Sequence, residues 1–174
     1  MNLALIGFMG AGKTTVGRRL ARMTGMQFAD SDAEITRVHG PIPEIFASRG
    51  ETQFRAYERE ALERLCARDA CVIAVGGGAV LDEGNRALLR RRCLVVHLAI
   101  SPEAAHARVA HRAHRPLLGE APSLERVRTL LAERADAYAH SDLRIAVDDS
   151  TAGRVAGTIA RWYRARSGGA EPSR

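Results

Sequence analysis

The sequence predicts an α/β fold with a parallel sheet flanked by helices, and three observations support this prediction. Short apolar runs alternate with longer segments of helical periodicity. A glycine-rich loop directly follows the first apolar run, and three consecutive glycines follow a later one. Because helices cover both faces of a parallel sheet, its strands are continuous apolar runs rather than alternating ones. Strands separated by helices form βαβ units and hence parallel sheets.

Five short segments bounded by glycine, proline or acidic residues are expected to be strands. In chain order they are residues 3–6, 27–29, 72–75, 94–99 and 143–147. Helices are expected over residues 13–23, after the glycine-rich loop, and over residues 51–69. Pro102 opens another helix, since proline suits the first helical position. A further helix, capped by Ser123, carries apolar residues at helical spacing over residues 124–138.

The length of 174 residues and the 46% hydrophobic content predict one domain of ordinary size with a buried core. We expect this domain to span residues 1–166, and residues 167–174 to form a flexible tail. No apolar run approaches the ~20 residues that cross a bilayer, so no membrane association is expected. The first residues lack the basic start and cleavage site of a signal peptide, which predicts a cytoplasmic protein.

The chain carries a net charge of +6 and a single lysine, Lys13, among its 26 basic residues. The arginines are spread along the chain, and only residues 90–92 form a run. Because basic and aromatic residues do not interleave, a nucleic-acid partner is not expected. A small polyanionic ligand would still benefit from the positive field. The three cysteines have no metal-site spacing, which predicts reduced thiols.

The strongest motif lies at residues 7–14, where GFMGAGKT matches the phosphate-binding pattern G-x-x-x-x-G-K-[ST]. Backbone N–H groups of such a loop cradle nucleotide phosphates, helped by the N-terminus of the following helix. Lys13 is expected to bridge the β- and γ-phosphates, and Thr14 to ligate Mg²⁺. A chance glycine-rich turn is disfavoured because a strand and a helix flank the complete motif. Guanine-specific proteins of this class usually carry an Asn-Lys-x-Asp segment, which needs a second lysine, so ATP is expected rather than GTP.

Two further motifs follow predicted strands, where ligands bind in open α/β sheets. One carboxylate of Asp30 and Asp32 could hold the water shell of a metal while the other orients an acceptor hydroxyl. Alternatively, Asp30 or Ser31 caps a helix, and both interpretations can hold together. Residues 76–78 are glycines, which either permit close approach of a ligand to the backbone or form a simple tight turn.

In this ordered combination of motifs the chain resembles the shikimate kinase family, from about residue 2 to residue 166. The residues that carry the resemblance are 7–17, 30–32, 42–46, 50–51, 54–55, 58, 76–80, 115–118, 134 and 138. The resemblance implies transfer of a phosphoryl group from ATP to the 3-hydroxyl of shikimate, a step of aromatic amino acid biosynthesis, with Mg²⁺ as cofactor. It implies a monomer with a P-loop NTPase fold, whose five-stranded parallel sheet is like that of nucleoside monophosphate kinases. The substrate-binding segment would span about residues 31–60 and the lid about residues 112–121.

The resemblance also implies the residues of the site. Those that bind the nucleotide are Gly10, Ala11, Gly12, Lys13, Thr14, Thr15, Arg108 and Arg115. Those that bind or surround shikimate are Asp32, Phe46, Phe54, Arg55, Glu58, Gly76, Gly77, Gly78 and Arg134. Those implied in metal binding are Thr14 and Asp30, and those implied in catalysis are Lys13, Asp32 and Arg115.

Within this set, five charged residues have distinct implied roles. Arg55 and Arg134 would grip the carboxylate of shikimate, because bidentate pairing supplies both geometry and energy. Glu58 would hold these arginines in place. Arg115 would reach the phosphates from the lid, and Arg108 would pack on adenine.

Two other functions fit parts of the sequence. A related small-molecule kinase, for example one acting on gluconate, would share the phosphate-binding loop, but Arg55, Arg134 and the three glycines favour shikimate. A nucleotide-binding module without catalysis is disfavoured by the intact Lys13 and Thr14 and by the two aspartates. Whether Asp32 acts as a base or only orients the hydroxyl is left open, since phosphoryl transfer depends mainly on positioning and charge.

Overall fold

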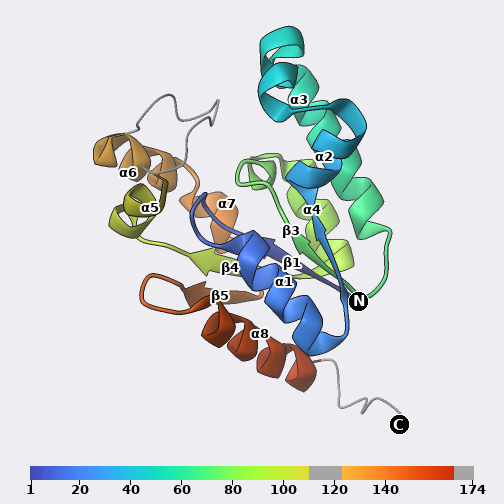
Figure 1. The fold of residues 1–174 in the computed structure, drawn as a ribbon, viewed down its shortest axis with the longest axis vertical. Coiled ribbons are helices and arrows are strands. Elements are labelled where there is room, and N and C mark those ends of the chain that lie inside the picture. Colours follow the sequence, from blue (N-terminus) through green and yellow to red (C-terminus); the bar gives the residue numbers. More distant parts are fainter. Residues whose placement is uncertain (110–122, 167–174) are drawn as a thin grey trace.

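The computed structural model describes residues 1–109 and 123–166 of the chain. Their strands form one parallel sheet in the order β2-β3-β1-β4-β5, with helices on both faces (Figure 1). The strands are β1 (Asn2–Ile6), β2 (Gln27–Asp30), β3 (Cys71–Ala74), β4 (Cys93–Ala99) and β5 (Leu143–Ala146). The predicted five-stranded parallel sheet is confirmed, and each predicted strand boundary lies within one residue of the observed one.

Helices connect the strands and continue beyond the last of them. In the described part of the chain they are α1 (Lys13–Thr24), α2 (Ser31–His39), α3 (Ile42–Cys66), the 3₁₀ turn η1 (Ala79–Leu81), α4 (Glu83–Arg92), α5 (Pro102–Val109), α6 (Leu124–Glu133), α7 (Ala135–Ala139) and α8 (Ala152–Arg166). The sequence prediction misses α8. Its buried residues recur at helical spacing and were the available signal: Val155, Ala156, Ile159 and Ala160.

Helix α3 begins earlier than predicted and bends once. The predicted helix over residues 51–69 corresponds to the part of α3 that follows Gly50, and it ends three residues sooner, at Cys66. At Gly50 the backbone is not helical, with φ 76° and ψ 176°. A positive φ favours glycine, so this residue permits the bend between the two arms of α3.

The predicted helix over residues 124–138 is divided at Arg134, which is a correction to the sequence prediction. Helix α6 ends at Glu133, and Arg134 has φ −102° and ψ −2°. Its N–H donates to the carbonyl of Leu131 (3.3 Å), the i→i−3 bond that tightens a last helical turn. Apolar spacing cannot reveal this break, because Tyr138 remains in register on the buried side.

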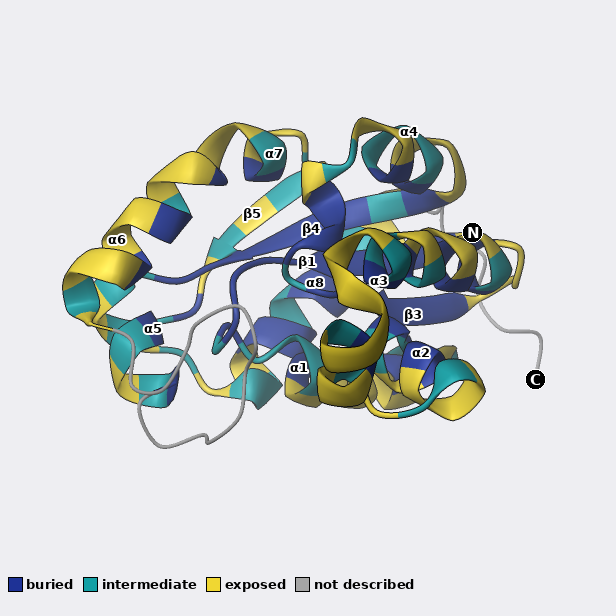
Figure 2. Cartoon of the chain, turned by 90° about the horizontal axis from the view of Figure 1, so that it is seen from above, coloured by how far each residue is buried: buried dark blue, intermediate teal, exposed yellow. Residues whose placement is uncertain are grey.

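The core has two layers, one on each face of the sheet (Figure 2). Side chains of β1 alternate between them, because successive residues of a strand point to opposite faces. Leu3 and Leu5 pack in the cluster that includes residues of α1 and α8. Ala4 and Ile6 pack in the cluster that includes residues of α3, α4 and α7. The two layers hold β1 and β3 in the centre of the sheet, so the loops at their carboxyl ends start from fixed points.

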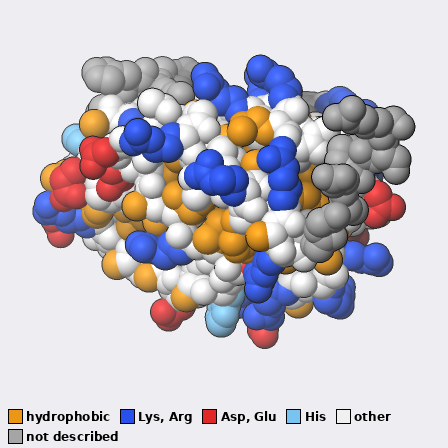
Figure 3. Space-filling model, turned by 90° about the horizontal axis from the view of Figure 1, so that it is seen from below, with side chains coloured by type: hydrophobic (Ala, Val, Ile, Leu, Met, Phe, Trp, Pro, Cys, Tyr) orange, Lys and Arg blue, Asp and Glu red, His pale blue; other side chains and the backbone are white. Residues whose placement is uncertain are grey.

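Basic side chains are dispersed over the outer surface of α1 and α8. Arg18, Arg19 and Arg22 of α1 and Arg154 and Arg161 of α8 are exposed. Figure 3 shows basic side chains on the face seen from below, separated by apolar and neutral ones. Their positive field is therefore spread over this face rather than gathered into one stripe. None of the helices in the described ranges has the length and apolar character of a transmembrane span.

Candidate active site

The phosphate-binding loop joins β1 to α1, as the sequence predicts. The ammonium of Lys13 donates to the carbonyls of Gly7 (2.7 Å) and Phe8 (3.2 Å), so the side chain lies against its own loop. Gly12 has φ 86°, a left-handed conformation that an L side chain rarely adopts. The loop therefore presents the N-terminus of α1, with its partial positive charge, beside the compact charge of Lys13.

Thr14 and Asp30 bring two oxygens together at the edge of the loop. The hydroxyl of Thr14 donates to Oδ2 of Asp30 (2.7 Å). Oδ1 of Asp30 accepts from the N–H groups of Asp32 (3.1 Å) and Ala33 (3.3 Å), and so caps α2. The capping interpretation is confirmed, and the same carboxylate faces the nucleotide loop.

The chemistry of this donor pair suits a hard divalent cation. Mg²⁺ prefers oxygen ligands and is usually bound through one or two protein groups plus substrate phosphates and water. Among the described residues there is no group of three or more His, Cys, Asp or Glu side chains that could form a closed metal cage. Thr14 and Asp30 thus fit a cation that arrives with a nucleotide better than one bound by the protein alone.

The glycines that follow β3 lie directly against charged side chains. A Cβ added to Gly76 would lie 2.6 Å from Oδ1 of Asp32, and one added to Gly78 would lie 2.8 Å from Nη1 of Arg55. A Cβ at either position would force the end of Asp32 or Arg55 to shift, so the lack of a Cβ lets these charged groups lie close to the backbone of the loop. The Gly76 N–H donates to the hydroxyl of Ser31 (2.8 Å), which fixes the start of the loop.

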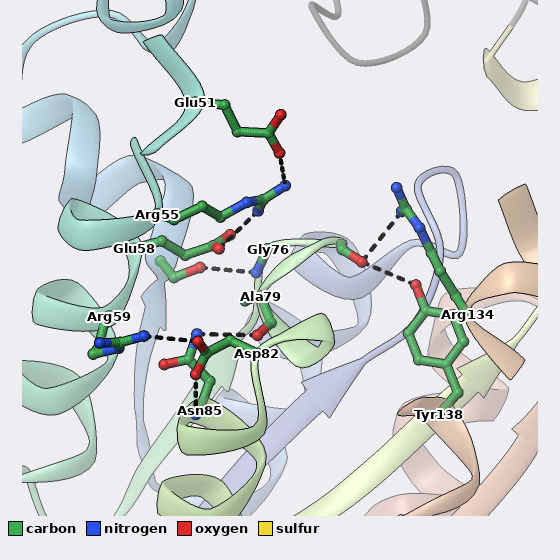
Figure 4. Close-up of polar contacts among 12 residues, drawn as sticks. Glu51, Arg55, Glu58, Arg59, Gly76, Ala79, Asp82, Asn85, Arg134 and Tyr138 are labelled. Carbon is green, nitrogen blue, oxygen red and sulfur yellow. Dashed lines mark hydrogen bonds and ion pairs between the residues drawn. The ribbon is translucent and has the colours of Figure 1, made fainter. Parts of the chain in front are cut away.

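Side chains from α3 and α4 hold the far end of the same loop (Figure 4). Nδ2 of Asn85 donates to the carbonyl of Ala79 (3.0 Å), and its backbone N–H donates to Oδ1 of Asp82 (2.8 Å). Arg59 of α3 pairs with the other oxygen of Asp82 at 2.7 Å. These contacts fix the loop from behind, so that its cavity side keeps one shape.

Arg55 lies between two carboxylates of its own helix (Figure 4). Its Nη1 is 2.8 Å from Oε2 of Glu58, and its Nη2 is 2.9 Å from Oε1 of Glu51. Burial raises the pKa of Glu58, which is only 2% exposed, and the bond from Arg55 acts in the opposite direction. Burial acts to lower the pKa of Arg55, but its bonds to Glu58 and Glu51 together raise it. The guanidinium therefore stays charged with a fixed orientation.

The second predicted arginine approaches from the opposite side. Arg134 is 5% exposed, and its guanidinium carbon lies 5.3 Å from the ring centroid of Phe8. Its Nη1 donates to the carbonyl of Gly77 (3.3 Å), which also accepts from the hydroxyl of Tyr138 (3.0 Å). The break between α6 and α7 thus brings Arg134 over the glycine loop.

The aromatic pair predicted for the wall of the site is also assembled. The rings of Phe46 and Phe54 are 4.6 Å apart between centroids and inclined by 37°. Phe54 is buried, and its ring also lies 5.3 Å from the guanidinium carbon of Arg55. This gives the cavity an apolar wall beside a cationic group.

Arg108 connects the nucleotide loop to the chain that follows β5. It donates to the carbonyl of Gly10 (3.2 Å) through Nη1, and to those of Val147 (3.0 Å) and Asp148 (2.9 Å) through Nη2. The residue also lines the cavity. Its predicted contact with adenine stays a prediction.

One cavity of about 460 Å³ lies between these groups. The predicted site residues that line it are Gly10, Gly12, Lys13, Thr14, Thr15, Asp30, Asp32, Phe46, Phe54, Arg55, Glu58, Gly77, Gly78, Arg108 and Arg134. Ala11 is buried, and neither it nor Gly76 is among the lining residues. Arg115 and the predicted lid over residues 112–121, like the predicted tail over residues 167–174, lie outside the described residues.

The sequence prediction of the site misses five lining residues. They are Met9, Ile42, Pro43, Ala74 and Val75. Ala74 and Val75 immediately precede the three glycines, so their position at the end of a central strand was a usable signal. Met9, Ile42 and Pro43 lie in two of the segments that carry the resemblance, residues 7–17 and 42–46, but the resemblance implied no site role for them.

Comparison with known proteins gives consistent results. A family model described as shikimate kinase matches residues 9–164. A shikimate kinase of Nitrobacter winogradskyi is 46% identical over 149 residues, which cover 85% of this chain and 70% of that protein. One of Geobacter metallireducens is 42% identical over 160 residues, covering 91% and 88%. A shikimate kinase from Acinetobacter baumannii, solved in complex with shikimate, has a TM-score of 0.90 and 39% identity, and the match covers 95% of this chain and 93% of that one.

The parallel sheet, the nucleotide loop and the adjoining arginine-lined cavity define a P-loop kinase for a small-molecule acceptor. A gluconokinase from Sinorhizobium meliloti shares the fold, with a TM-score of 0.60 and 21% identity. At the level of family the match is specific: the chain belongs to the shikimate kinase family. It is an enzyme that phosphorylates shikimate with ATP, and kinases of this kind generally work with a divalent cation.

Proposed function

We propose that this kinase transfers the γ-phosphoryl group of ATP to the 3-hydroxyl of shikimate, using the two sides of the described cavity. One observation carries the proposal: a single cavity joins Lys13 and Thr14 on one side to Asp32, Arg55 and Arg134 on the other. A donor nucleotide and a small carboxylate acceptor can thus meet in one cavity. Placing two reactants in contact supplies much of the catalysis in phosphoryl transfer.

On the acceptor side, two guanidinium groups converge on the glycine loop. Arg55 is oriented by Glu58 and Glu51, and Arg134 is oriented by the Gly77 carbonyl. Both are charged donors with planar geometry that matches a carboxylate. We assign them to the carboxylate of shikimate, with the backbone beside Gly78 and the rings of the aromatic wall completing the pocket.

On the donor side, Lys13 and the loop N–H groups bind the phosphates. Lys13 carries a compact charge that fits between phosphate oxygens, where a guanidinium is too broad. Thr14 and Asp30 would hold Mg²⁺, which would neutralise charge on the β- and γ-phosphates. Asp32 lies beside Gly76 and within the cavity, so we assign it to the acceptor hydroxyl, which it orients toward the donor.

Other parts of the proposal concern the whole chain. We propose that residues 1–166 form one kinase domain, with the substrate-binding segment over about residues 31–60. A lid over residues 112–121 would carry Arg115 to the phosphates and exclude water.

We also propose that the enzyme acts as a monomer in the cytoplasm. The three cysteines of the chain are buried free thiols, as expected for a reducing compartment.

The test is an ADP-release assay with purified protein, ATP and Mg²⁺, run with shikimate, with gluconate and without an acceptor. We expect ADP release to depend on shikimate and the product to carry phosphate on its 3-oxygen, as determined by NMR. Turnover of gluconate but not shikimate would contradict the proposal. ATP binding without any acceptor-dependent turnover would point instead to a nucleotide-binding module.

A further inference from the structure

The carbonyl of Gly77 accepts hydrogen bonds from two side chains of one short segment. Arg134 donates through Nη1 at 3.3 Å, and Tyr138 donates through its hydroxyl at 3.0 Å (Figure 4). The two residues are themselves linked, because the Tyr138 N–H donates to the Arg134 carbonyl at 3.1 Å. Figure 4 shows both side chains reaching the same oxygen from the α7 side.

These two hydrogen bonds to one carbonyl oxygen fix the plane of the Gly77–Gly78 peptide. In a trans peptide the N–H points opposite to the C=O, so the direction of the Gly77 carbonyl also sets that of the Gly78 N–H. Glycine backbones are otherwise the least constrained in a protein. Since Gly78 lines the cavity beside Arg55, a rotation of this peptide would change both its surface and its donor.

The hydroxyl of Tyr138 also bears on Arg134. A carbonyl oxygen has two lone pairs, so that of Gly77 can accept from Tyr138 and Arg134 at the same time. With the oxygen held by Tyr138, one N–H of Arg134 has a fixed acceptor, and the remaining donors of its guanidinium stay directed by that contact. The ring of Phe8, 5.3 Å from the guanidinium carbon, restricts the other face.

The ring of Tyr138 is fixed in turn by the sheet. Tyr138 is 3% exposed and stacks on His97 of β4, with centroids 4.8 Å apart and an interplanar angle of 19°. His97 pairs in register with Ile6, the residue before the nucleotide loop. The chain of contacts therefore runs from the central strands through two stacked rings to a single backbone oxygen in the site.

We propose that Tyr138 is a positioning residue for shikimate binding, which acts through the Gly77 carbonyl on Arg134 and on the Gly78 N–H. This inference rests on the proposed acceptor site. Tyr138 is not a catalytic group in this proposal, because its hydroxyl donates to the protein backbone. His97 is the support against which the tyrosine ring is held.

The test is Tyr138→Phe, which keeps the ring and its stacking and removes only the donor. We expect the KM and the Kd for shikimate to rise about fivefold, the loss typical of one neutral hydrogen bond, with the KM for ATP unchanged. Tyr163→Phe is the matched control. Tyr163 lies on α8, away from the cavity, and its hydroxyl donates to the carbonyl of Met1 (3.5 Å). It should leave both constants unchanged.

A purely structural role for Tyr138 would change thermal stability without separating shikimate from ATP. Equal changes in both KM values, or none in either, would overturn the inference. Wild-type protein without shikimate turnover would contradict the proposed function instead, so the two failures are distinguishable.

If Tyr138→Phe does not fold, 3-fluorotyrosine at position 138 provides the test. Its phenol ionises at lower pH than that of tyrosine and then cannot donate. Because burial raises the pKa of Tyr138, ionisation is followed by ultraviolet absorbance in the same pH series. Once the phenol is ionised, the KM for shikimate should exceed that of wild type at the same pH, and an equal KM would overturn the inference.

Discussion

The phosphate-binding part of the donor side comes from one stretch of chain, whereas the acceptor side is assembled from separate segments. Residues 7–14 supply the loop, the lysine and the threonine of the donor side. The acceptor side takes Asp32 from α2, Arg55 from α3, the glycines after β3, and Arg134 from the break between α6 and α7. The bond from Arg134 to Gly77 alone joins residues 57 apart in the chain.

The difference follows from the chemistry of the two ligands. Phosphates are bound by successive backbone N–H groups and a helix N-terminus, which a local turn provides. A small ring with a carboxylate needs charged side chains that converge from different directions. Each such side chain then needs its own partner to hold it, as Glu58 does for Arg55 and the Gly77 carbonyl for Arg134. The donor side should therefore respond to changes of its own motif, and the acceptor side to changes of distant partners.

The largest effect is expected on the donor side from Lys13→Arg. The ammonium of Lys13 fits beside the carbonyls of Gly7 and Phe8, and a planar guanidinium cannot occupy this position. We expect kcat/KM to fall about 1,000-fold, as when a charge-stabilising group is lost from an active site, while the Kd for shikimate alone stays the same. Steady-state kinetics and calorimetric titration measure the two quantities. Near-normal turnover would show that the loop does not require a compact charge.

On the acceptor side, Arg134→Ala should have the next largest effect. It removes a buried cation from the proposed carboxylate site, for which we expect a loss of about 100-fold or more in kcat/KM for shikimate. ATP binding should remain measurable by titration. Arg126→Ala, an exposed position on α6, is the control and should behave like wild type. Unchanged turnover of the Arg134 variant would contradict the carboxylate assignment.

Glu58→Gln is expected to change the thermal stability of the protein and its affinity for shikimate in opposite directions. It weakens the orientation of Arg55, so the KM for shikimate should rise about tenfold, the loss expected for a charged hydrogen bond. Because burial raises the pKa of Glu58, its ionisation in the folded state disfavours folding as pH rises above 4.5. The variant should thus unfold at a higher temperature than wild type at pH 7 and at the same temperature near pH 4.

Calorimetry at the two pH values and steady-state kinetics test this trade-off. Glu63→Gln is the matched control, because Glu63 is an exposed carboxylate of the same helix that does not line the cavity, and it should change both quantities little. A lower melting temperature at pH 7 together with an unchanged KM would assign Glu58 a purely structural role.

The smallest expected effect is a pH dependence of stability due to His97, the residue of β4 that stacks on Tyr138. Burial, followed by the charges of Arg144 and Lys13, lowers the pKa of His97 to about 4 from a usual value of 6.5. Its contribution to stability is therefore fully present above pH 6.5 and is lost progressively as pH falls toward 4, because only the unfolded chain takes up the proton in that window. His97→Phe keeps a ring against Tyr138 and should flatten this part of the pH profile. Chemical denaturation at pH 7.5, 5.5 and 4.5 measures it, and parallel profiles of variant and wild type would refute the assignment.

Much of the fold could be predicted because its signals are local. The five strands are short apolar runs with clear boundaries, and each was placed within one residue. The break at Arg134 could not be predicted in the same way, since the apolar spacing continues through it to Tyr138. The arm of α3 that begins at Ile42 was missed, and the non-helical backbone of Gly50 separates it from the arm that was predicted.

The residues of the site likewise differ in whether a local pattern in the sequence could predict them. Sequence by itself determined the phosphate-binding loop, because residues 7–14 contain both the backbone geometry and the charge that phosphates require. It also determined that Asp30 follows a strand and caps a helix. Resemblance to a family, rather than composition or spacing, selected Arg55, Arg108 and Arg134 among the many arginines, and all three line the cavity. Only the tertiary structure showed that a tyrosine and an arginine share one glycine carbonyl. The physical reason is that these contacts join segments far apart in the chain, and no local pattern records where distant side chains converge.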